Sequence, residues 1–270
     1  MTPRSPAPDA ALQPHSAMRA GRASPARSAE RFGRIQLLDL VRGAAIVGVV
    51  VYHFCWDLNL FGLFATDVTK QVGWVMFARS LAGTFMALVG VNLVLAHAAG
   101  IRWLAFLRRL LVIVAAAAVI SIATYAAFPE SFIYFGILHA IAVFNLLGLA
   151  FLRAPALLLL IAAILLFVVP DYLRFDILNV RPLAWIGLAS WPPSSDDFVP
   201  IFPWFALPLM GILGARLALG PPWAVRLFRA NSNWPGFRAL AWAGRHSLGI
   251  YLLHQPVLLG TLYVVTSLRP

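Results

Sequence analysis

The chain has few charged side chains and almost no lysine or cysteine. Charged residues make up 11% of the 270 residues, against about 25% in a soluble domain, and hydrophobic residues reach 61%. This composition excludes an ordinary soluble globular domain. Cys55 is the single cysteine, which excludes an intrachain disulfide and a cysteine-based metal site. Lys70 is the single lysine, so the net charge of +11 comes almost entirely from arginine.

Long apolar runs take the place of the missing charges. Most are near twenty residues long, the length of helix that crosses a bilayer, and the mean hydropathy of the chain is +0.83. We therefore expect an all-α fold, a polytopic transmembrane helical bundle. About seven spans are predicted, at residues 37–56, 72–96, 110–127, 132–151, 156–169, 201–219 and 247–266.

Two stretches depart from this pattern. Pro203 and Pro208 predict a kink or a break near the start of the sixth span, because proline interrupts the helical hydrogen-bond ladder. Residues 181–191 include Trp185 and Trp191, and tryptophan gathers at the membrane interface. This segment therefore predicts a surface or re-entrant helix.

Arginines and acids lie in alternate connections. The arginines crowd the N-terminal tail and the connections at 97–109, 153 and 216–245, and the acids lie in the loops 57–71, 128–131 and 170–200. Positive charge marks the cytoplasmic side of a membrane protein, so the N-terminus is predicted in the cytoplasm and the C-terminus outside. The same placement indicates topology and contact with anionic lipid of the bilayer, and leaves room for one anionic substrate, rather than nucleic acid.

Residues 1–34 differ from the rest of the chain. They are rich in Pro, Ala, Ser and Arg and show no apolar periodicity, a composition typical of disorder. We expect a disordered basic cytoplasmic tail here and one transmembrane domain over residues 35–270.

The first span carries a stripe of polar side chains. Arg42 and His53 are eleven residues apart, which on a helix places them within about 20° of one face and about 16 Å apart along the axis. Asp39 and Trp56 lie near the same stripe, and Asp57 is four residues beyond His53. Ionisable groups within a membrane span are expected to face a protein interior or a water-filled cavity, which makes them candidates for function.

Each candidate also has a structural interpretation. Arg42 can be a topology anchor that reaches the interface, and His53 an interfacial residue. In apolar helices such as those of His139 and His254, a histidine more often forms hydrogen bonds between helices than takes part in chemistry, and both roles stay open. Arg79 in the second span is expected to face the interior and to pair with an acid or a phosphate, because an arginine facing lipid is costly.

Other polar residues receive no chemical role. Asn92 is expected to hold helices together. His15, His97 and His246 lie in the tail or at the ends of spans. The chain has no His-x-x-x-His or HExxH spacing, so neither a metal site nor haem ligation is predicted.

Several segments resemble a known superfamily of membrane enzymes. The segment LDLVRGAAIVGVVVYH has an arginine, ten residues and then a histidine, which resembles the pattern of the acyltransferase-three superfamily. The segment AGRHSLGIYLLHQPVLL is similar to the last helix of that superfamily. Three further segments of the chain resemble the short bacterial branch related to the catalytic domain of heparan-alpha-glucosaminide N-acetyltransferase. They are YHFCWDLNLFG, FPESFIYFGILHAIAVFNLLGL and PWFALPLMGILGARL. The likeness covers about residues 35–266.

The resemblance implies an enzyme that transfers an acyl group, usually acetyl from acetyl-CoA, at or across the membrane to an acceptor that is often a sugar. It implies a multi-pass protein of the bacterial inner membrane. It also implies that Arg42 helps to bind the CoA donor and that His53 is the catalytic histidine. The chain lacks the large luminal domain and extra spans of the lysosomal enzyme, so heparan itself is not the expected acceptor.

The other candidates are assigned around these two residues. Donor phosphates at the cytoplasmic face are expected to meet arginine side chains, which bind phosphate in a bidentate manner. His53 is expected to act as a general base or as an acyl carrier, and Asp57 to orient its ring or to bind the acceptor. The expected donor-binding residues are Arg42, Arg79, Arg108 and Arg109, and the expected acceptor-binding residues are Trp56, His139 and His254.

Two other classes of protein fit part of the sequence. A small-solute transporter would use the intramembrane Arg, His and Asp side chains as a substrate or proton relay, although no internal repeat favours an inverted-repeat transporter. A non-enzymatic assembly or lipid-binding subunit would use its polar residues only to join helices.

Overall fold

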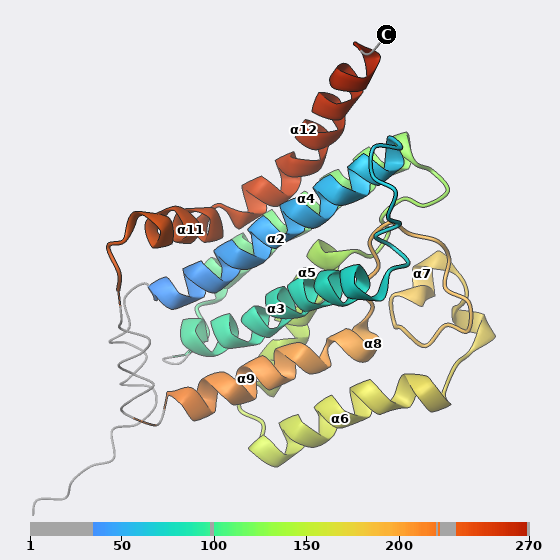
Figure 1. The fold of residues 1–270 in the computed structure, drawn as a ribbon. Coiled ribbons are helices and arrows are strands. Elements are labelled where there is room, and N and C mark those ends of the chain that lie inside the picture. Colours follow the sequence, from blue (N-terminus) through green and yellow to red (C-terminus); the bar gives the residue numbers. More distant parts are fainter. Residues whose placement is uncertain (1–34, 98–99, 220, 222–230, 269–270) are drawn as a thin grey trace, which may run out of the picture.

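The computed structural model describes residues 35–97, 100–219, 221 and 231–268, which fold into helices joined by loops (Figure 1). The elements are α2 (Gln36–Leu60), α3 (Val72–His97), α4 (Trp103–Ala127), α5 (Ile137–Phe151), α6 (Ala156–Tyr172), the 3-10 helix η1 (Asp176–Leu178), α7 (Arg181–Ala184), α8 (Ile201–Trp204), α9 (Ala206–Ala218), α11 (Pro235–Arg245) and α12 (Ser247–Ser267). The described residues form no strand beyond two isolated bridges. The predicted all-α fold is confirmed, and the predicted disordered tail lies outside the described residues.

Five helical segments are long and apolar enough to cross a membrane. They are α2, α3, α4, the α8–α9 pair over Ile201–Ala218, and α12. The shorter helices α5 and α6 are also apolar. Each of the seven predicted spans therefore coincides with a helix, and the described helices are those of a multi-pass membrane protein. The number of spans and the side of each terminus stay predictions.

Three predicted boundaries are wrong by a helical turn or more. α2 ends at Leu60 instead of residue 56. α4 begins at Trp103 instead of residue 110, so Arg108 and Arg109 are helical and lie close enough to its end for their side chains to reach polar surroundings. α5 begins at Ile137 instead of residue 132. Its first backbone N–H donates to the carboxylate of Asp197 at 2.7 Å, which fixes the start of the helix.

The two unusual stretches have different outcomes. The predicted break in the sixth span is confirmed, because Phe202 has non-helical φ and ψ at the start of α8. The predicted helix over 181–191 is wrong beyond the four residues of α7. The chain then turns through Gly187, whose φ is +94°, a conformation that favours glycine. Trp185 packs against Phe135 with ring centroids 5.7 Å apart.

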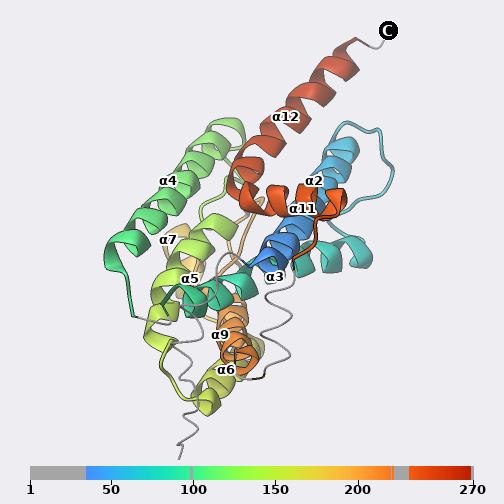
Figure 2. The ribbon, with the colours of Figure 1, turned by 90° about the vertical axis from the view of Figure 1, so that its left-hand side faces the viewer.

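The connections gather at two ends of the bundle. The loops 61–71, 128–136 and 173–200 lie at one end, which we call the loop end. The start of α2, the last turns of α3 and α9, and α11 lie at the opposite end, which we call the α11 end. Figure 2 shows α11 beside α2, with α12 rising between α2 and α4 and extending past them.

Two close helix crossings fix this arrangement. A Cβ atom on Gly43 would lie 2.0 Å from the carbonyl oxygen of Leu240, and one on Gly90 would lie 2.0 Å from that of Pro208. Only glycine lets helix backbones approach so closely. The first crossing holds α11 against α2 beside Arg42, and the second joins α3 to α9 within the larger hydrophobic core.

Candidate functional site

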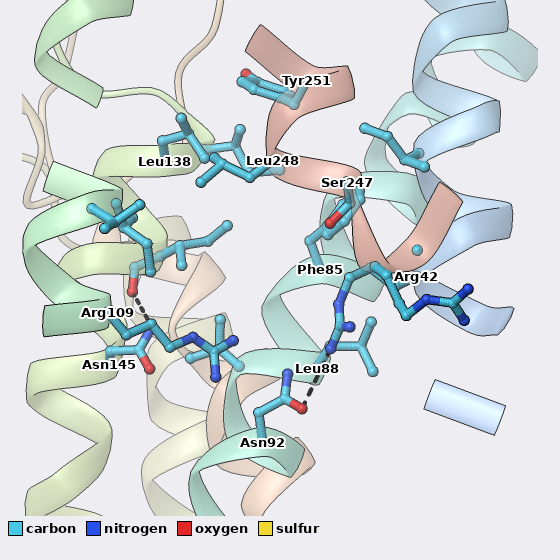
Figure 3. Close-up of a pocket in the computed structure, with 18 residues that line it drawn as sticks. Arg42, Phe85, Leu88, Asn92, Arg109, Leu138, Asn145, Ser247, Leu248 and Tyr251 are labelled. Carbon is cyan, nitrogen blue, oxygen red and sulfur yellow. Dashed lines mark hydrogen bonds between the residues drawn. The ribbon is translucent and has the colours of Figure 1, made fainter. Parts of the chain in front are cut away.

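A cavity of about 250 Å³ lies among α2, α3, α4, α5, α11 and α12 in the half of the bundle nearer the α11 end. Most of its wall is apolar, and its polar lining residues are Arg42, Asn92, Arg109, Asn145, Arg245, Ser247 and Tyr251. Figure 3 shows Arg42 and Asn92 on one side and Arg109 and Asn145 on the other. Two of the four arginines predicted to bind a donor thus line one cavity, and Arg245 is a third that was not predicted.

Arg42 is held by partners on two helices. Its guanidinium pairs with the Asp39 carboxylate at 3.1 Å, and its Nη2 donates to Asn92 Oδ1 at 3.4 Å. Asp39 is only 5% exposed, so the pairing offsets the cost of burying its charge. The opposite side of α2 presents exposed Val47 and Val51. Arg42 therefore faces the bundle and pairs with Asp39, and Asn92 joins two helices as expected.

Arg79 and Arg108 lie outside this cavity. Arg79 is exposed, contrary to the expectation that it faces the interior, because Phe77 and Leu81 form the side of α3 that packs on α2. Arg108 is exposed on α4, whereas its neighbour Arg109 lines the cavity. A donor-binding role for Arg79 and Arg108 stays a prediction.

His53 and His254 lie side by side in the half of the bundle nearer the loop end. Their ring centroids are 4.8 Å apart. Nδ1 of His254 is 2.8 Å from the carbonyl oxygen of Tyr251; because a carbonyl only accepts, this Nδ1 carries the hydrogen and Nε2 of a neutral ring has a lone pair. Nε2 of His254 and Nδ1 of His53 are buried and have no hydrogen-bond partner among the residues that the structure describes. Buried polar atoms are nearly always bonded, so these two mark a place where a ligand can supply the partner.

Asp57 extends this cluster one turn beyond His53. It is fully buried, and its Oδ1 accepts a hydrogen bond from Gln255 Nε2 at 2.7 Å. Asp57 Oδ2 and Gln255 Oε1 are also buried, with no partner in the described part of the chain. The Trp56 ring meets that of His53 edge-on, with ring centroids 6.5 Å apart. The structure thus brings together four predicted residues, His53, Trp56, Asp57 and His254. Within the described residues no group of three or more His, Cys, Asp or Glu side chains is placed to hold a metal.

Tyr251 connects the cavity with the histidine pair. It lines the cavity, and its ring centroid is 5.6 Å from that of His254. Its hydroxyl donates to Asp197 Oδ2 at 3.2 Å, the same oxygen that accepts the N–H of Ile137. Burial raises the pKa of Asp197, and these two hydrogen bonds oppose the shift. A residue of the loop end therefore anchors the side chain that stands between the cavity and the histidines.

A family model covers this whole arrangement. The family described as heparan-alpha-glucosaminide N-acetyltransferase, catalytic, matches residues 34–256. The chain belongs to this family. The match runs from the start of α2 into α12, so it includes the cavity and the histidine pair. No match was found among curated proteins or among solved structures. Membership in the N-acetyltransferase family implies transferase activity.

His139 has a separate position in this member of the N-acetyltransferase family. Its Nδ1 accepts the backbone N–H of Gly136 at 3.2 Å, and its Nε2 is 3.2 Å from Ser121 Oγ. That hydroxyl donates to the carbonyl of Ile133 at 2.6 Å. Both ring nitrogens therefore serve the connection between α4 and α5, which is the structural interpretation of an intramembrane histidine. An acceptor-binding role for His139 stays a prediction.

Besides Arg245, Tyr251, Gln255 and Asp197 were missed in the sequence. Tyr251 and Gln255 lie three residues before and one after His254, so the helical spacing of the last span was a signal that could have found Tyr251. Asp197 stands in the polar loop segment WPPSSDD, where nothing local separates it from Asp196. Its role depends on the loop folding back onto α5 and α12.

Proposed function

We propose that the protein is an integral-membrane acyltransferase that moves an acyl group, acetyl in the simplest case, from acyl-CoA to a hydroxyl or amine of an envelope acceptor such as a sugar. One observation carries the proposal: the arginine-lined cavity adjoins the buried histidine pair at Tyr251, and each histidine has one ring nitrogen without a partner among the described residues. A donor held by its phosphates near the α11 end can therefore extend toward His53. The family description names an N-acetyltransferase, and this supports acetyl transfer as the class of reaction that we propose.

Arg42, Arg109 and Arg245 supply positive charge to the part of the site that we assign to the acyl-CoA donor. The nucleotide end of CoA carries phosphates, which arginine binds through paired N–H groups. A cavity of about 250 Å³ lies below the range of roughly 300–1,000 Å³ for whole drug-sized ligands, so we assign it to the pantetheine arm. Leu88 and Leu138 supply apolar wall for that arm, and the nucleotide is assigned to the mouth of the cavity. The α11 end is the predicted cytoplasmic side, where acyl-CoA is available.

His53 is the residue we assign to group transfer. As a general base it takes the proton of the acceptor hydroxyl or amine while that oxygen or nitrogen attacks the thioester carbonyl, and the CoA thiolate leaves and is then protonated. As an acyl carrier its ring nitrogen attacks the thioester first, CoA leaves as the thiol, and the acceptor then takes the acyl group from the ring. Asp57 is one turn away, where it can orient the imidazole or bind the acceptor.

The acceptor is assigned to the loop-end side of the histidine pair. Asp57 Oδ2 and Gln255 Oε1 accept hydrogen bonds and have no partner, so they suit a molecule rich in hydroxyl or amine N–H groups. The Trp56 ring beside His53 offers an apolar face to a sugar. A sugar combines both features, which is why it is the acceptor class that we propose.

The test uses the purified full-length protein with acetyl-CoA labelled in the acetyl group. With a membrane glycan extract, we expect label to move to an acceptor whose mass rises by one acetyl group, with release of free CoA. Without the extract, label retained on the protein after denaturation would select the acyl-carrier route. Transport of a solute into vesicles without CoA, together with no acylated product, would contradict the proposal and support a transporter.

A further inference from the structure

A second and larger cavity, of about 790 Å³, lies at the α11 end. It is formed where α3, α5 and α9 end and α6 begins. It shares no lining residue with the arginine-lined cavity described above. Whatever it binds is therefore separate from the acyl donor, and the proposed acyl transfer does not use it.

Among the described residues that line this second cavity, every polar side chain is basic. Arg153 follows α5, Arg216 lies in the last turn of α9, and His97 ends α3. Arg216 donates to the backbone carbonyl of Ala154, which holds it beside Arg153 and uses only part of its donor capacity. The described lining residues include no acid. The cavity therefore offers two guanidinium groups, from different segments, to an anion.

The rest of the wall is apolar and reaches the outer surface of the bundle. Val94, Leu149 and Leu213 line the interior. Leu217 is 65% exposed and Ile101 36% exposed at its edge. A water-soluble phosphate compound has little apolar surface to place against such a wall. An acyl chain lying along the wall removes apolar surface of both the chain and the cavity from water.

We infer that this cavity binds an anionic phospholipid, with the headgroup phosphate between Arg153 and Arg216 and an acyl chain along Leu213 and Leu217. Basic pockets between membrane helices on the cytoplasmic side suit such headgroups. Arginines that served only as topology anchors would need no cavity between them. The residues of this site come from the end of α5, the start of α6 and the end of α9. A bound lipid therefore stabilises the folded arrangement of these three helices by mass action.

The experiment measures lipid retention by native mass spectrometry on the full-length protein in detergent. The probes are a phosphatidylglycerol, a phosphatidylcholine with the same acyl chains, and inorganic phosphate. The wild type is expected to retain phosphatidylglycerol in preference to phosphatidylcholine. The combined substitution Arg153→Gln and Arg216→Gln is expected to weaken phosphatidylglycerol binding at least about tenfold, since hydrogen bonds to charged groups are lost.

Arg102→Gln is the matched control, because Arg102 is an exposed arginine just before α4 and lies outside both cavities. It is expected to leave retention unchanged. If the combined variant does not fold, Arg153→Gln alone replaces it, since Arg153 is exposed, and a loss of at least about threefold is expected. Equal retention by the wild type and the cavity variants, equal retention of the two lipids, or displacement of phosphatidylglycerol by millimolar phosphate would overturn the inference.

Discussion

The arginine-lined cavity and the histidine pair are two polar regions of one apolar bundle, and they satisfy their polar groups differently. In the cavity, Arg42 is bonded to Asp39 and Asn92, and Asn145 donates to the carbonyl of Ile141. At the histidine pair, one side-chain atom each of His53, Asp57, His254 and Gln255 is buried with no hydrogen-bond partner within the described ranges. Leaving such a group unbonded costs about 1–3 kcal/mol.

This difference indicates how the two regions work. The cavity holds Arg42 in position before a ligand arrives, as suits a site for a strongly charged donor. The histidine pair retains a local cost to stability that a bound substrate can relieve, and natural proteins keep such costs mainly where function requires them. The following variants test whether the two regions differ in this way.

Replacing His53 has the largest expected effect. His53→Gln keeps a side chain of similar size and polarity but removes the titratable ring, so we expect acetyl transfer to fall by about 10²- to 10⁴-fold, the usual contribution of a general base. The measurement is the turnover rate with labelled acetyl-CoA. Binding of acetyl-CoA should change little, because His53 does not line the donor cavity. Turnover at the wild-type rate would remove His53 from the mechanism.

Arg109→Gln tests the donor part of the site, with Arg102→Gln as its matched control. Arg109 lines the cavity, whereas Arg102, an exposed arginine just before α4, does not line it and has no predicted role in donor binding. Loss of hydrogen bonds to a phosphate, about 1.5–3 kcal/mol, corresponds to roughly 10- to 150-fold weaker binding of acetyl-CoA. Equilibrium binding of labelled acetyl-CoA measures this directly. If the two variants bind equally, the cavity is not the donor site.

His254→Phe tests the cost of the unpartnered atoms. The substitution keeps an aromatic ring and removes the buried lone pair of Nε2, but it also removes the Nδ1–H bond to the carbonyl of Tyr251, so the two effects oppose each other and thermal stability should change by less than about 1 kcal/mol. Acetyl transfer should fall, by up to about 10²-fold, because His53 loses its neighbour and its alignment. His139→Phe is the contrast: both nitrogens of His139 have partners, so the same change should lower stability by about 1–3 kcal/mol. Equal stability changes in the two variants would remove the distinction.

Gly43→Ala is expected to have the smallest effect on transfer and to act through packing. The added methyl group would meet the carbonyl of Leu240 at 2.0 Å, so α11 must move away from α2, at a cost of about 1–3 kcal/mol. Gly249→Ala in α12 is the control, since nothing lies within 4 Å of the added group, and it should be neutral or stabilising by up to about 1 kcal/mol. Thermal unfolding in detergent compares them, and equal melting temperatures would show that the crossing is not tight.

The parts of the site that were predictable from sequence lie within single helices. Asp39, Arg42, His53 and Asp57 share one side of α2 because the helical repeat alone places them there. Contacts between distant segments were not predictable. Tyr251 and Asp197 are 54 residues apart in the chain, and their bond depends on how the loop 173–200 folds.

The wrong prediction for Arg79 has the same physical origin. Its position within an apolar span indicated an inward side chain. Which side of α3 faces inward at that height is decided by the packing of Phe77 and Leu81 on α2, and that packing cannot be read from α3 alone. The start of α5 is similar, because its cap is a carboxylate 60 residues further along the chain.

The most direct test of the central claim is an experimental structure of the protein with acetyl-CoA bound. We predict phosphates in contact with Arg42, Arg109 or Arg245, an arm that passes Tyr251, and a thioester next to His53. A nucleotide bound elsewhere in the bundle, or a thioester that packed side chains keep away from His53, would contradict the account.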